Sequence, residues 1–284
     1  MPTSAAEALS AGRLTRFPGA GGVSLAARLA GPEDAPPIVL VHGFSQGALA
    51  WIAQLDSILT EHFRLVAVDL RGHGASAGGP PESYADGAAW AADLESALVN
   101  FAAGRPAVLV GWSYGGRILC EYVRRYGTAR LRGLVFVGAT GGGGTEKSRA
   151  LLGPGSAALP AMVEDDPAVS IPATRAFLEA CVASPLPREH ADLMLAVNAR
   201  VSPATRRAML GWVCDFDDLL PTVALPTLVI HGAQDTVVRP ESGARIARMI
   251  PGARLETVAD AGHCVFLETP DRFNALLAGF AAAP

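Results

Sequence analysis

One serine of this chain stands in a setting that favours nucleophilic chemistry. Ser113 lies in the run GWSYGG at 111–116, between the apolar stretch 107–110 and the amphipathic stretch 114–126. A serine hydroxyl attacks a carbonyl carbon only when it is exposed and lies beside a base. A sharp turn from strand to helix exposes it, and glycines two positions before and after it let both arms approach. An ordinary helix N-cap is the competing interpretation, but the strand before and helix after favour a nucleophilic Ser113.

With that strand and helix, the segment resembles the nucleophile elbow of α/β-hydrolase-fold enzymes, and the resemblance extends from about Leu14 to the C-terminus. It implies an α/β fold with a mostly parallel sheet of about eight strands, flanked by helices and carrying a helical cap. Haloalkane dehalogenases and epoxide hydrolases resemble this fold but place aspartate at the elbow, and dienelactone-type hydrolases place cysteine there. A serine therefore points to acyl transfer.

The family orders its catalytic residues as nucleophile, acid and histidine. Asp235 matches the acid, because it follows a buried apolar run, and His263 matches the histidine, because it follows the stretch 254–258. A triad needs a base within reach of the hydroxyl, oriented by a buried carboxylate. A surface-loop acid and a helix-capping histidine are the competing interpretations. Some relatives take the acid after the strand at 131–137, but here Ala139-Thr140-Gly follows it.

The same resemblance implies an oxyanion hole made of two backbone N–H groups. One belongs to Tyr114, directly after the nucleophile, and the other to Phe44, directly after the His-Gly pair of an expected strand. Because main-chain groups donate, we expect the two aromatic side chains to shape the pocket instead. Phe44 as an ordinary core residue is the alternative.

A further segment, DLRGHGAS at 69–76, resembles the family's R-G-x-G-x-S loop. We expect Arg71 and Ser76 to hold loops together by hydrogen bonds. His73 is expected to be a loop histidine with its polar atoms satisfied, rather than a base or a metal ligand. His42 and His231 precede glycines at strand ends, and we expect structural roles for both.

These residues need an alternation of strands and helices to bring them together. Short β-branched runs alternate with alanine-rich helical stretches, which indicates a parallel sheet. A hairpin is expected at 14–17 and 23–29, and a last helix is expected to begin at Thr269-Pro270, capped by the threonine. The remaining expected strands are 38–42, 65–69, 107–112, 131–138, 225–231 and 254–258, and the expected helices are 48–60, 84–102, 114–126 and 241–249.

This alternation stops after the four-glycine run at 141–144, which looks like a linker. Apolar residues at helical spacing follow at 171–183, 188–201 and 204–214. Ser202-Pro203 supplies a cap and a first-turn proline for the last of these helices. We expect a core domain at 1–140 and 220–284, with a cap at 141–219 lying over the carboxyl ends of the strands, where open α/β sheets bind ligands.

Five apolar residues are candidates for contacts with a substrate, four of them in the expected cap: Trp112, Phe177, Met194, Met209 and Trp212. Most such residues form the core of the cap itself. Trp112 gives the segment G-W-S-x-G, which resembles the carboxylesterases of the biotin pathway. Cys264 could line an acyl pocket or be oxidised, although a small hydrophobic role is the usual one. The cap also carries five arginines that we expect on a solvated face: Arg175, Arg188, Arg200, Arg206 and Arg207.

Composition narrows the class of protein. Hydrophobic residues make up 50% of the 284 residues and the net charge is −4, which excludes a disordered chain and gives no basic footprint for nucleic acid. The first residues lack the apolar core of a secretory signal, and no run is long enough to span a membrane. The four cysteines form no C-x-x-C motif and no zinc-binding spacing. We therefore expect a cytoplasmic protein without a membrane or nucleic-acid partner.

Taken together, the sequence predicts a serine esterase that cleaves a carboxylic ester or lactone with a small-to-medium apolar acyl group. It needs no metal and no organic cofactor, and its partner is the small-molecule ester. Cofactor-free perhydrolases or haloperoxidases and carbon–carbon bond hydrolases resemble the chain too, although the latter typically place tryptophan where Cys264 stands. A non-catalytic ligand-binding receptor is a further alternative. The sequence leaves the physiological substrate and the oligomeric state open.

Overall fold

An eight-stranded sheet forms the centre of the computed structural model, which describes residues 11–85 and 87–283. The strands lie in the order β1-β2-β4-β3-β5-β6-β9-β10. β2 pairs antiparallel with both β1 and β4, and every other pair in the sheet is parallel. The strands are β1 (Arg13–Pro18), β2 (Ser24–Ala30), β3 (Pro37–Val41), β4 (Arg64–Asp69), β5 (Ala107–Trp112), β6 (Leu131–Val137), β9 (Thr227–Gly232) and β10 (Arg254–Val258). The expected parallel sheet and its edge hairpin are thereby confirmed.

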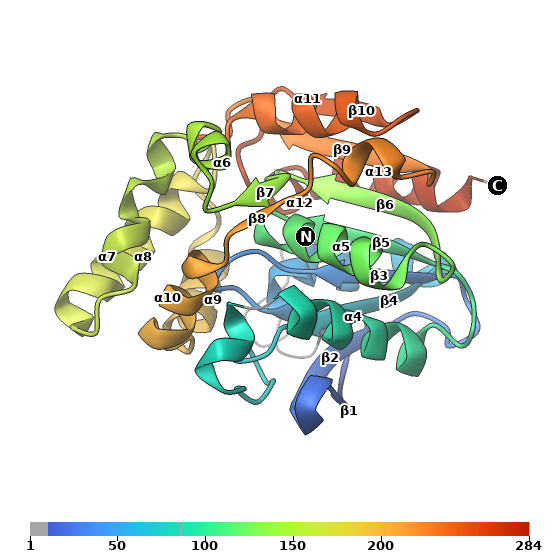
Figure 1. The fold of residues 1–284 in the computed structure, drawn as a ribbon, viewed down its shortest axis with the longest axis horizontal. Helices are drawn as coiled ribbons and strands as arrows, with labels where there is room; N and C mark the ends of the chain where they lie inside the picture. The colour runs from blue at the N-terminus through green and yellow to red at the C-terminus, as the bar shows by residue number, and fades with distance from the viewer. Residues whose placement is uncertain (1–10, 86, 284) are drawn as a thin grey trace.

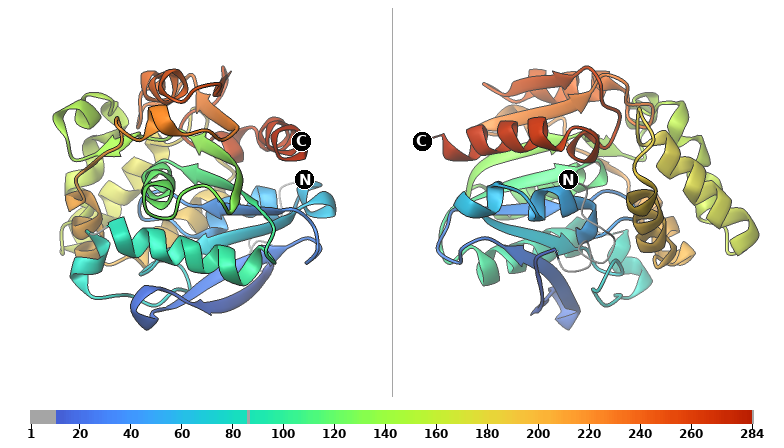
Figure 2. Two further views of the ribbon diagram at one scale, coloured as in Figure 1. Left: turned by 45° about the vertical axis from the view of Figure 1, so that its right-hand side comes forward. Right: turned by 180° about the vertical axis from the view of Figure 1, so that it is seen from behind.

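Helices cover both faces of this sheet, which explains why its central strands are apolar throughout. Every residue of β3, β4, β5 and β9 is buried. Helices α4 (Gly87–Phe101) and α5 (Tyr114–Tyr126) lie against one face. The opposite face carries α13 (Pro270–Ala282) and the short helix α2 (Ile52–Leu55), as the view from behind in Figure 2 shows. Two further helices, α11 (Pro240–Met249) and α12 (Val265–Glu268), flank β9 and β10.

Residues 141–219, which we call the helical insert, separate β6 from β9. Figure 1 shows its helices gathered at one end of the strands. They are α6 (Glu146–Ala150), α7 (Leu159–Met162), α8 (Pro167–Ala180), α9 (Arg188–Ala199) and α10 (Pro203–Gly211). The insert begins and ends in a two-stranded ribbon, because β7 (Gly142–Gly143) pairs with β8 (Cys214–Asp215). The glycine run is thus not a plain linker: a Cβ on Gly142 would lie 2.9 Å from the Cys214 carbonyl oxygen.

The expected helix at 48–60 is broken. The structure has a 3-10 turn η2 (Ala48–Trp51), then α2, then α3 (Leu59–His62). The hydroxyl of Ser57 donates to the Gln54 carbonyl and accepts from the Leu59 N–H, so a side chain takes over from helical bonding. The segment Asp56–Ile58 therefore forms a bend that the spacing of apolar residues does not predict.

The two expected helix caps differ in outcome. Ser202 accepts a hydrogen bond from the Thr205 N–H and is followed by a proline in the first turn of α10, as expected. At α13 the proline is in the first turn, but the expected cap by Thr269 is wrong. Its hydroxyl instead donates to the Val265 carbonyl, 3.0 Å away in α12. Within the described residues, no helix is long and apolar enough to cross a membrane.

Candidate active site

Ser113 occupies the turn between β5 and α5 in a backbone conformation that few residues adopt. Its φ is 54° and its ψ is −112°, and its side chain is half-buried. Outside glycine, such a conformation persists only where the surrounding structure holds it, and it is a mark of functional sites. The Ser113 N–H donates to the Val137 carbonyl, 2.8 Å away at the end of β6. The end of the neighbouring strand β6 therefore holds this turn in place.

Small residues make this turn sterically possible. A Cβ on Gly111 would lie 2.8 Å from the carbonyl carbon of Gly115, and one on Gly115 would lie 2.7 Å from the Val41 carbonyl oxygen. Gly43, in the loop after β3, is equally confined, since its Cβ would lie 3.2 Å from the Cβ of Ser113. The structure thus supplies the steric reason for the glycine spacing seen in the sequence.

Asp235 and His263 meet at the same edge of the sheet. The Nδ1 atom of His263 lies 2.7 Å from Oδ2 of Asp235, and both side chains are buried. The other carboxylate oxygen, Oδ1, accepts hydrogen bonds from the N–H groups of Val237 and Val238, both at 2.9 Å. Because three donors fix the carboxylate, it holds the imidazole in one orientation.

A second histidine contacts the same carboxylate, which the sequence did not reveal. Nε2 of His231, at the end of β9, lies 3.1 Å from Oδ2 of Asp235 and 3.0 Å from the Val238 carbonyl oxygen. Its spacing of four residues from Asp235 is the signal that could have found it. Burial by itself raises the pKa of Asp235, but the neighbouring His263 and the bond from His231 outweigh burial and hold that pKa well below its ordinary value. Asp235 is consequently ionised at neutral pH.

Two further residues position His263 from the side of Ser113. Nε1 of Trp112 donates to the His263 carbonyl oxygen at 3.0 Å, and the two rings lie 5.6 Å apart. Trp112 thus supports the segment that carries His263, and its expected contact with a substrate stays a prediction. Gly138, directly after β6, packs against the pair: a Cβ there would lie 3.0 Å from Nδ1 of His263 and 3.3 Å from Oδ2 of Asp235. A glycine at the end of a buried strand was the available signal for this contact.

The two expected oxyanion donors follow the neighbouring strands β5 and β3. Tyr114 is the first residue of α5, so its N–H has no acceptor within the helix. Phe44 lies in the loop after β3, and its ring is 6.4 Å from that of Tyr114. The Tyr114 hydroxyl donates to the Met209 carbonyl at 3.2 Å, which ties the first turn of α5 to the helical insert. The side chains of both residues are buried and their rings lie close together, and the expectation that they shape the pocket stays a prediction.

Arg71 and Ser76 hold the loop at 69–76 by hydrogen bonds, as expected, but the expectation that both ring nitrogens of His73 are satisfied is wrong. Arg71 forms a buried bidentate ion pair with Asp93 of α4, with both N–O distances 2.7 Å. The Ser76 hydroxyl donates to the Asp69 carbonyl at 2.6 Å and accepts from the Ala26 N–H at 2.8 Å. His73 is held through Nδ1, which lies 2.8 Å from the Arg71 carbonyl, while its Nε2 has no partner in the described part of the chain. Burial lowers the pKa of His73 to about 4.

A cavity of about 390 Å³ lies beside the candidate histidine. Its walls are mostly apolar, and they come from α8, α9 and the segment after His263, including Met194, Leu178, Leu195 and Cys264. Cys264 is therefore both buried and part of the cavity wall, and burial, together with a hydrogen bond to Cys181, raises the pKa of its thiol well above the ordinary value. A neutral thiol is a poor nucleophile, so Cys264 serves as an apolar surface.

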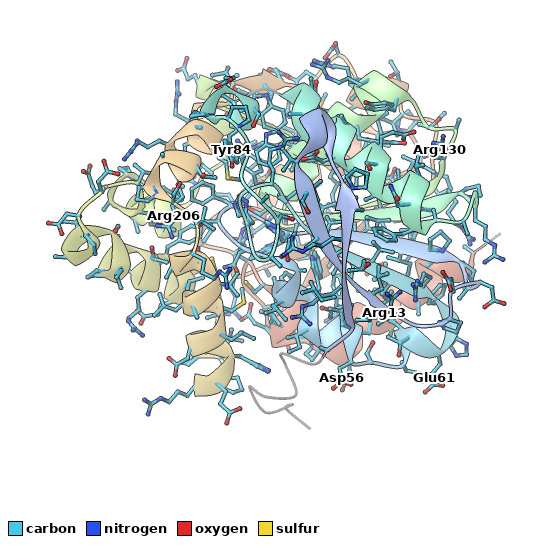
Figure 3. All side chains as sticks on the ribbon, turned by 90° about the horizontal axis from the view of Figure 1, so that it is seen from below. Arg13, Asp56, Glu61, Tyr84, Arg130 and Arg206 are labelled. Carbon is cyan, nitrogen blue, oxygen red and sulfur yellow. The ribbon has the colours of Figure 1, made fainter. Side chains whose placement is uncertain are left out.

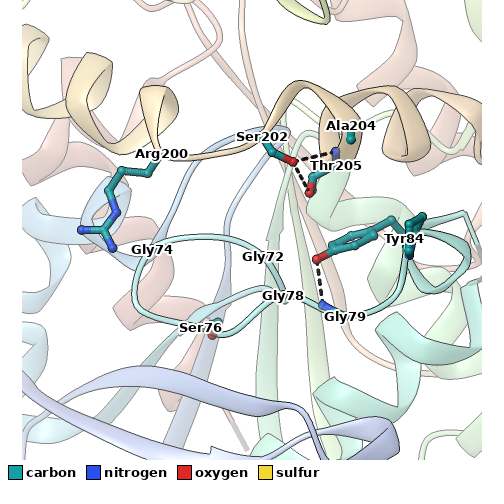
Figure 4. Close-up of a pocket in the computed structure, with 11 residues that line it drawn as sticks. Gly72, Gly74, Ser76, Gly78, Gly79, Tyr84, Arg200, Ser202, Ala204 and Thr205 are labelled. Atoms are coloured by element: carbon teal, nitrogen blue, oxygen red, sulfur yellow. Dashed lines mark hydrogen bonds between the residues drawn. The ribbon is translucent and has the colours of Figure 1, made fainter. Parts of the chain in front are cut away.

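A second cavity, of about 400 Å³, lies between the 72–81 loop and the start of α10 (Figure 4). It is lined by glycines and hydroxyl groups, and the Tyr84 hydroxyl accepts a bond from the Gly79 N–H at its edge. None of Ser113, Asp235 and His263 lines it. None of the three lines the cavity beside Cys264 either, but Cys264 directly follows His263 in the chain and the walls of that cavity are mostly apolar, so it is the better candidate for a substrate pocket.

The residues expected to contact a substrate differ in where their side chains lie. Met194 lines the cavity beside Cys264. Phe177, Met209 and Trp212 are buried members of the hydrophobic core cluster, and the Trp212 ring lies 5.7 Å from that of Tyr114. No group of three or more histidine, cysteine or acidic side chains that could hold a metal ion occurs at 11–85 or 87–283.

Comparisons with known proteins show which proteins this chain resembles. The model of a family described as "Alpha/beta hydrolase family" matches residues 38–276. The crystal structure of the esterase RhEst1 from Rhodococcus sp. ECU1013 superposes with a TM-score of 0.89 at 31% identity, covering 95% of this chain and 98% of that one. A pimeloyl-[acyl-carrier protein] methyl ester esterase from Methylococcus capsulatus is 30% identical over 87% of this chain and 95% of its own. A bifunctional esterase/perhydrolase from Acinetobacter calcoaceticus is 29% identical over 79% of this chain and 84% of its own.

Proposed function

Because this chain belongs to the alpha/beta hydrolase family and is a hydrolase, we propose that it is a serine esterase that cleaves carboxylic esters or lactones through an acyl-serine intermediate. The observation that carries the proposal is the bond of 2.7 Å between the Asp235 carboxylate and His263. That pair packs against Gly138 and Trp112, at the sheet edge where the strained Ser113 turn begins. Such an arrangement makes a serine hydroxyl reactive.

In the first half of the proposed cycle, Nε2 of His263 takes the proton of the Ser113 hydroxyl as Oγ attacks the ester carbonyl carbon. The carbonyl oxygen becomes an oxyanion, which the N–H groups of Phe44 and Tyr114 stabilise. The imidazolium formed lies beside the ionised Asp235, which stabilises it without taking its proton. When the tetrahedral species collapses, the alkoxide leaves with the proton from His263.

In the second half, water replaces the alcohol. His263 removes a proton from water as its oxygen attacks the acyl carbon, and the same oxyanion site is used again. Collapse breaks the bond to Ser113, which recovers its proton from the imidazolium, and releases the carboxylic acid. Each step moves one proton between groups of this chain and the substrate, so the cycle closes without an oxidant or reductant.

The substrate class follows from the cavity beside Cys264. Its apolar walls and volume of about 390 Å³ suit a small-to-medium apolar group, with Met194 adapting to its shape. We propose that the helical insert acts as a cap over this site, because α8, α9 and the segment between them supply most of the cavity wall. The esterase activity of the similar Rhodococcus and Methylococcus proteins supports this choice.

A perhydrolase activity at the same serine is the second candidate, because one similar protein is named a bifunctional esterase/perhydrolase. There hydrogen peroxide would replace water in the second half, giving a peracid and free Ser113. Bromination of a dye in acetate, peroxide and bromide would report the peracid, because a peracid oxidises bromide to the brominating species. Ester hydrolysis without any bromination would reject this second activity and leave the first intact.

A fluorophosphonate probe and a panel of p-nitrophenyl esters test the proposal directly. We expect the probe to label Ser113, and we expect Ser113→Ala to abolish labelling and reduce ester hydrolysis to background while the circular dichroism spectrum stays unchanged. Ser148→Ala, which changes a buried serine of α6, is the matched control and should keep the activity. Wild-type rates in Ser113→Ala would refute the mechanism, and an unreactive Ser113 in the wild type would favour a non-catalytic binding role.

A further inference from the structure

One arginine of the helical insert departs from its expected place. Arg206 of α10 is 3% exposed, whereas its neighbour Arg207 and the other four arginines of the expected cap face solvent. Figure 3 shows Arg206 among the packed side chains of the insert, away from the rim where Arg130 lies. A buried guanidinium is costly unless its N–H groups are paired, so the position of this side chain needs an explanation.

The partners of Arg206 come from three other helices of the insert, or the residues that follow them, and one loop of the core. Its Nη1 donates to the Met162 carbonyl at 2.8 Å and to the Thr174 hydroxyl at 3.3 Å, and Nη2 donates to the Asn198 carbonyl at 2.5 Å. Its Nε donates to the hydroxyl of Ser45 at 2.9 Å. These four partners are thus carbonyl and hydroxyl oxygens, and burial lowers the pKa of Arg206.

Ser45 is the point at which this network reaches the candidate active site. It directly follows Phe44, whose N–H is the proposed oxyanion donor, and it is fully buried with a φ of 58°. A left-handed conformation is unfavourable for serine, so surrounding bonds have to hold it. At the other end of the same loop, Asp69 accepts from the Ala48 N–H at 2.6 Å. The core thus fixes one end of the loop, and Arg206 braces its strained middle.

From these contacts we propose that Arg206 is a positioning residue, which couples the docking of the helical insert to the shape of the oxyanion loop through Ser45. Four of its N–H bonds are already made to the protein, so it braces the loop and does not bind the substrate. When the insert docks, the guanidinium is buried and fixes Ser45, and the Phe44 N–H is aimed at the oxyanion. When the insert moves away, Arg206 is hydrated and the loop loses this brace.

The inference rests on the proposed function, because an oxyanion loop has meaning only for acyl transfer. A donor that acts on the oxyanion affects the transition state more than substrate binding. We therefore expect Arg206→Lys, which loses the planar fork, to lower kcat for a p-nitrophenyl ester about tenfold to thirtyfold, with KM changed by less than about threefold. Phosphonylation of Ser113 by a fluorophosphonate should slow by a similar factor, because that adduct is also tetrahedral.

Ser45→Gly tests the same bond from its other end. It removes the hydroxyl and leaves the buried guanidinium in place, and glycine adopts a φ near 58° without strain. We expect the same loss in kcat as for Arg206→Lys, and the double variant should be no slower than the slower single variant. Arg207→Lys, which changes the exposed neighbouring arginine, is the control and should keep wild-type kcat.

The outcomes separate the two proposals. If the wild type hydrolyses esters and labels at Ser113 but Arg206→Lys and Ser45→Gly keep kcat within about twofold, the coupling is wrong and the proposed function stands. Losses that multiply in the double variant would also overturn it, because independent effects do not share one bond. If Arg206→Lys fails to fold, the kcat of Ser45→Gly alone tests the proposed coupling. A wild type without hydrolysis or labelling refutes the proposed function, and the coupling with it.

Discussion

Gly138→Ala is the sharpest test of how the candidate triad is packed. Gly138 has a φ of +50°, and the added methyl carbon would lie 3.0 Å from Nδ1 of His263 and 3.3 Å from Oδ2 of Asp235. Contacts this close require the imidazole to move by a few tenths of an ångström, which weakens its bond of 2.7 Å to Asp235. Misplacement of a catalytic base by a fraction of an ångström to 1 Å costs about tenfold to hundredfold in rate, or about 1.4 to 2.7 kcal/mol.

Gly252→Ala is the matched control for this experiment. Gly252 has a φ of +74°, and nothing lies within 4 Å of the position that its Cβ would take. Both variants should lose about 1 kcal/mol of unfolding free energy from the left-handed backbone, measured by urea denaturation. Only Gly138→Ala should lose kcat/KM, by about tenfold to hundredfold, in p-nitrophenyl ester hydrolysis. Equal kcat/KM for the two variants would refute the reasoning.

Three other predictions follow from burial and charge. Because the pKa of Asp235 is lower in the folded chain than the ordinary value near 4, the carboxylate stabilises the fold above that pH and its contribution falls as the medium is acidified. The stability difference between the wild type and Asp235→Asn, measured in urea, should therefore shrink from about pH 6 towards about pH 2; a constant difference would contradict this. Asp93→Asn should cost about 3 kcal/mol of unfolding free energy, since it leaves Arg71 buried without its charge partner. Asp192→Asn, in an exposed pair, should cost less than about 1 kcal/mol, and equal losses would argue against a role for burial. Met194→Trp should fill the cavity beside Cys264 and lower kcat/KM for octanoyl esters about tenfold or more, with acetyl esters unchanged; unchanged octanoyl rates would place the acyl group elsewhere.

Short sequence patterns identified much of the candidate active site. Ser113 was found from its flanking glycines, and the structure shows the close backbone contacts that exclude larger residues there. Asp235 and His263 were found because each follows a buried strand, and the carboxyl ends of parallel strands meet at one edge. The contact between them is confirmed as a bond, while their catalytic roles stay a prediction. Such motifs can be found in the sequence because each depends on residues that are close together in the chain.

Other features depend on which surfaces meet, and no local pattern encodes that. Arg206 and Arg207 are adjacent arginines in one helix, yet one is buried and the other is exposed. The difference arises from the packing of α10 against the Ser45 loop and neighbouring helices. The sequence placed both arginines on a solvated face, and for Arg206 this was wrong. Likewise, Thr269 bonds backwards to Val265 because α12 happens to end beside it.

The order of strands in the sheet also determines which part of the candidate active site unfolds most easily. Ser113 and the Phe44 loop extend from β5 and β3 in the middle of the sheet, whereas His263 follows β10 at its edge. β10 is half open to solvent and pairs on one side only, so it belongs to the part of the sheet that frays first. Mild denaturant or heat should therefore detach His263, the proposed general base, from an otherwise intact molecule. Inactivation would then precede global melting, and it would reverse on cooling or dilution.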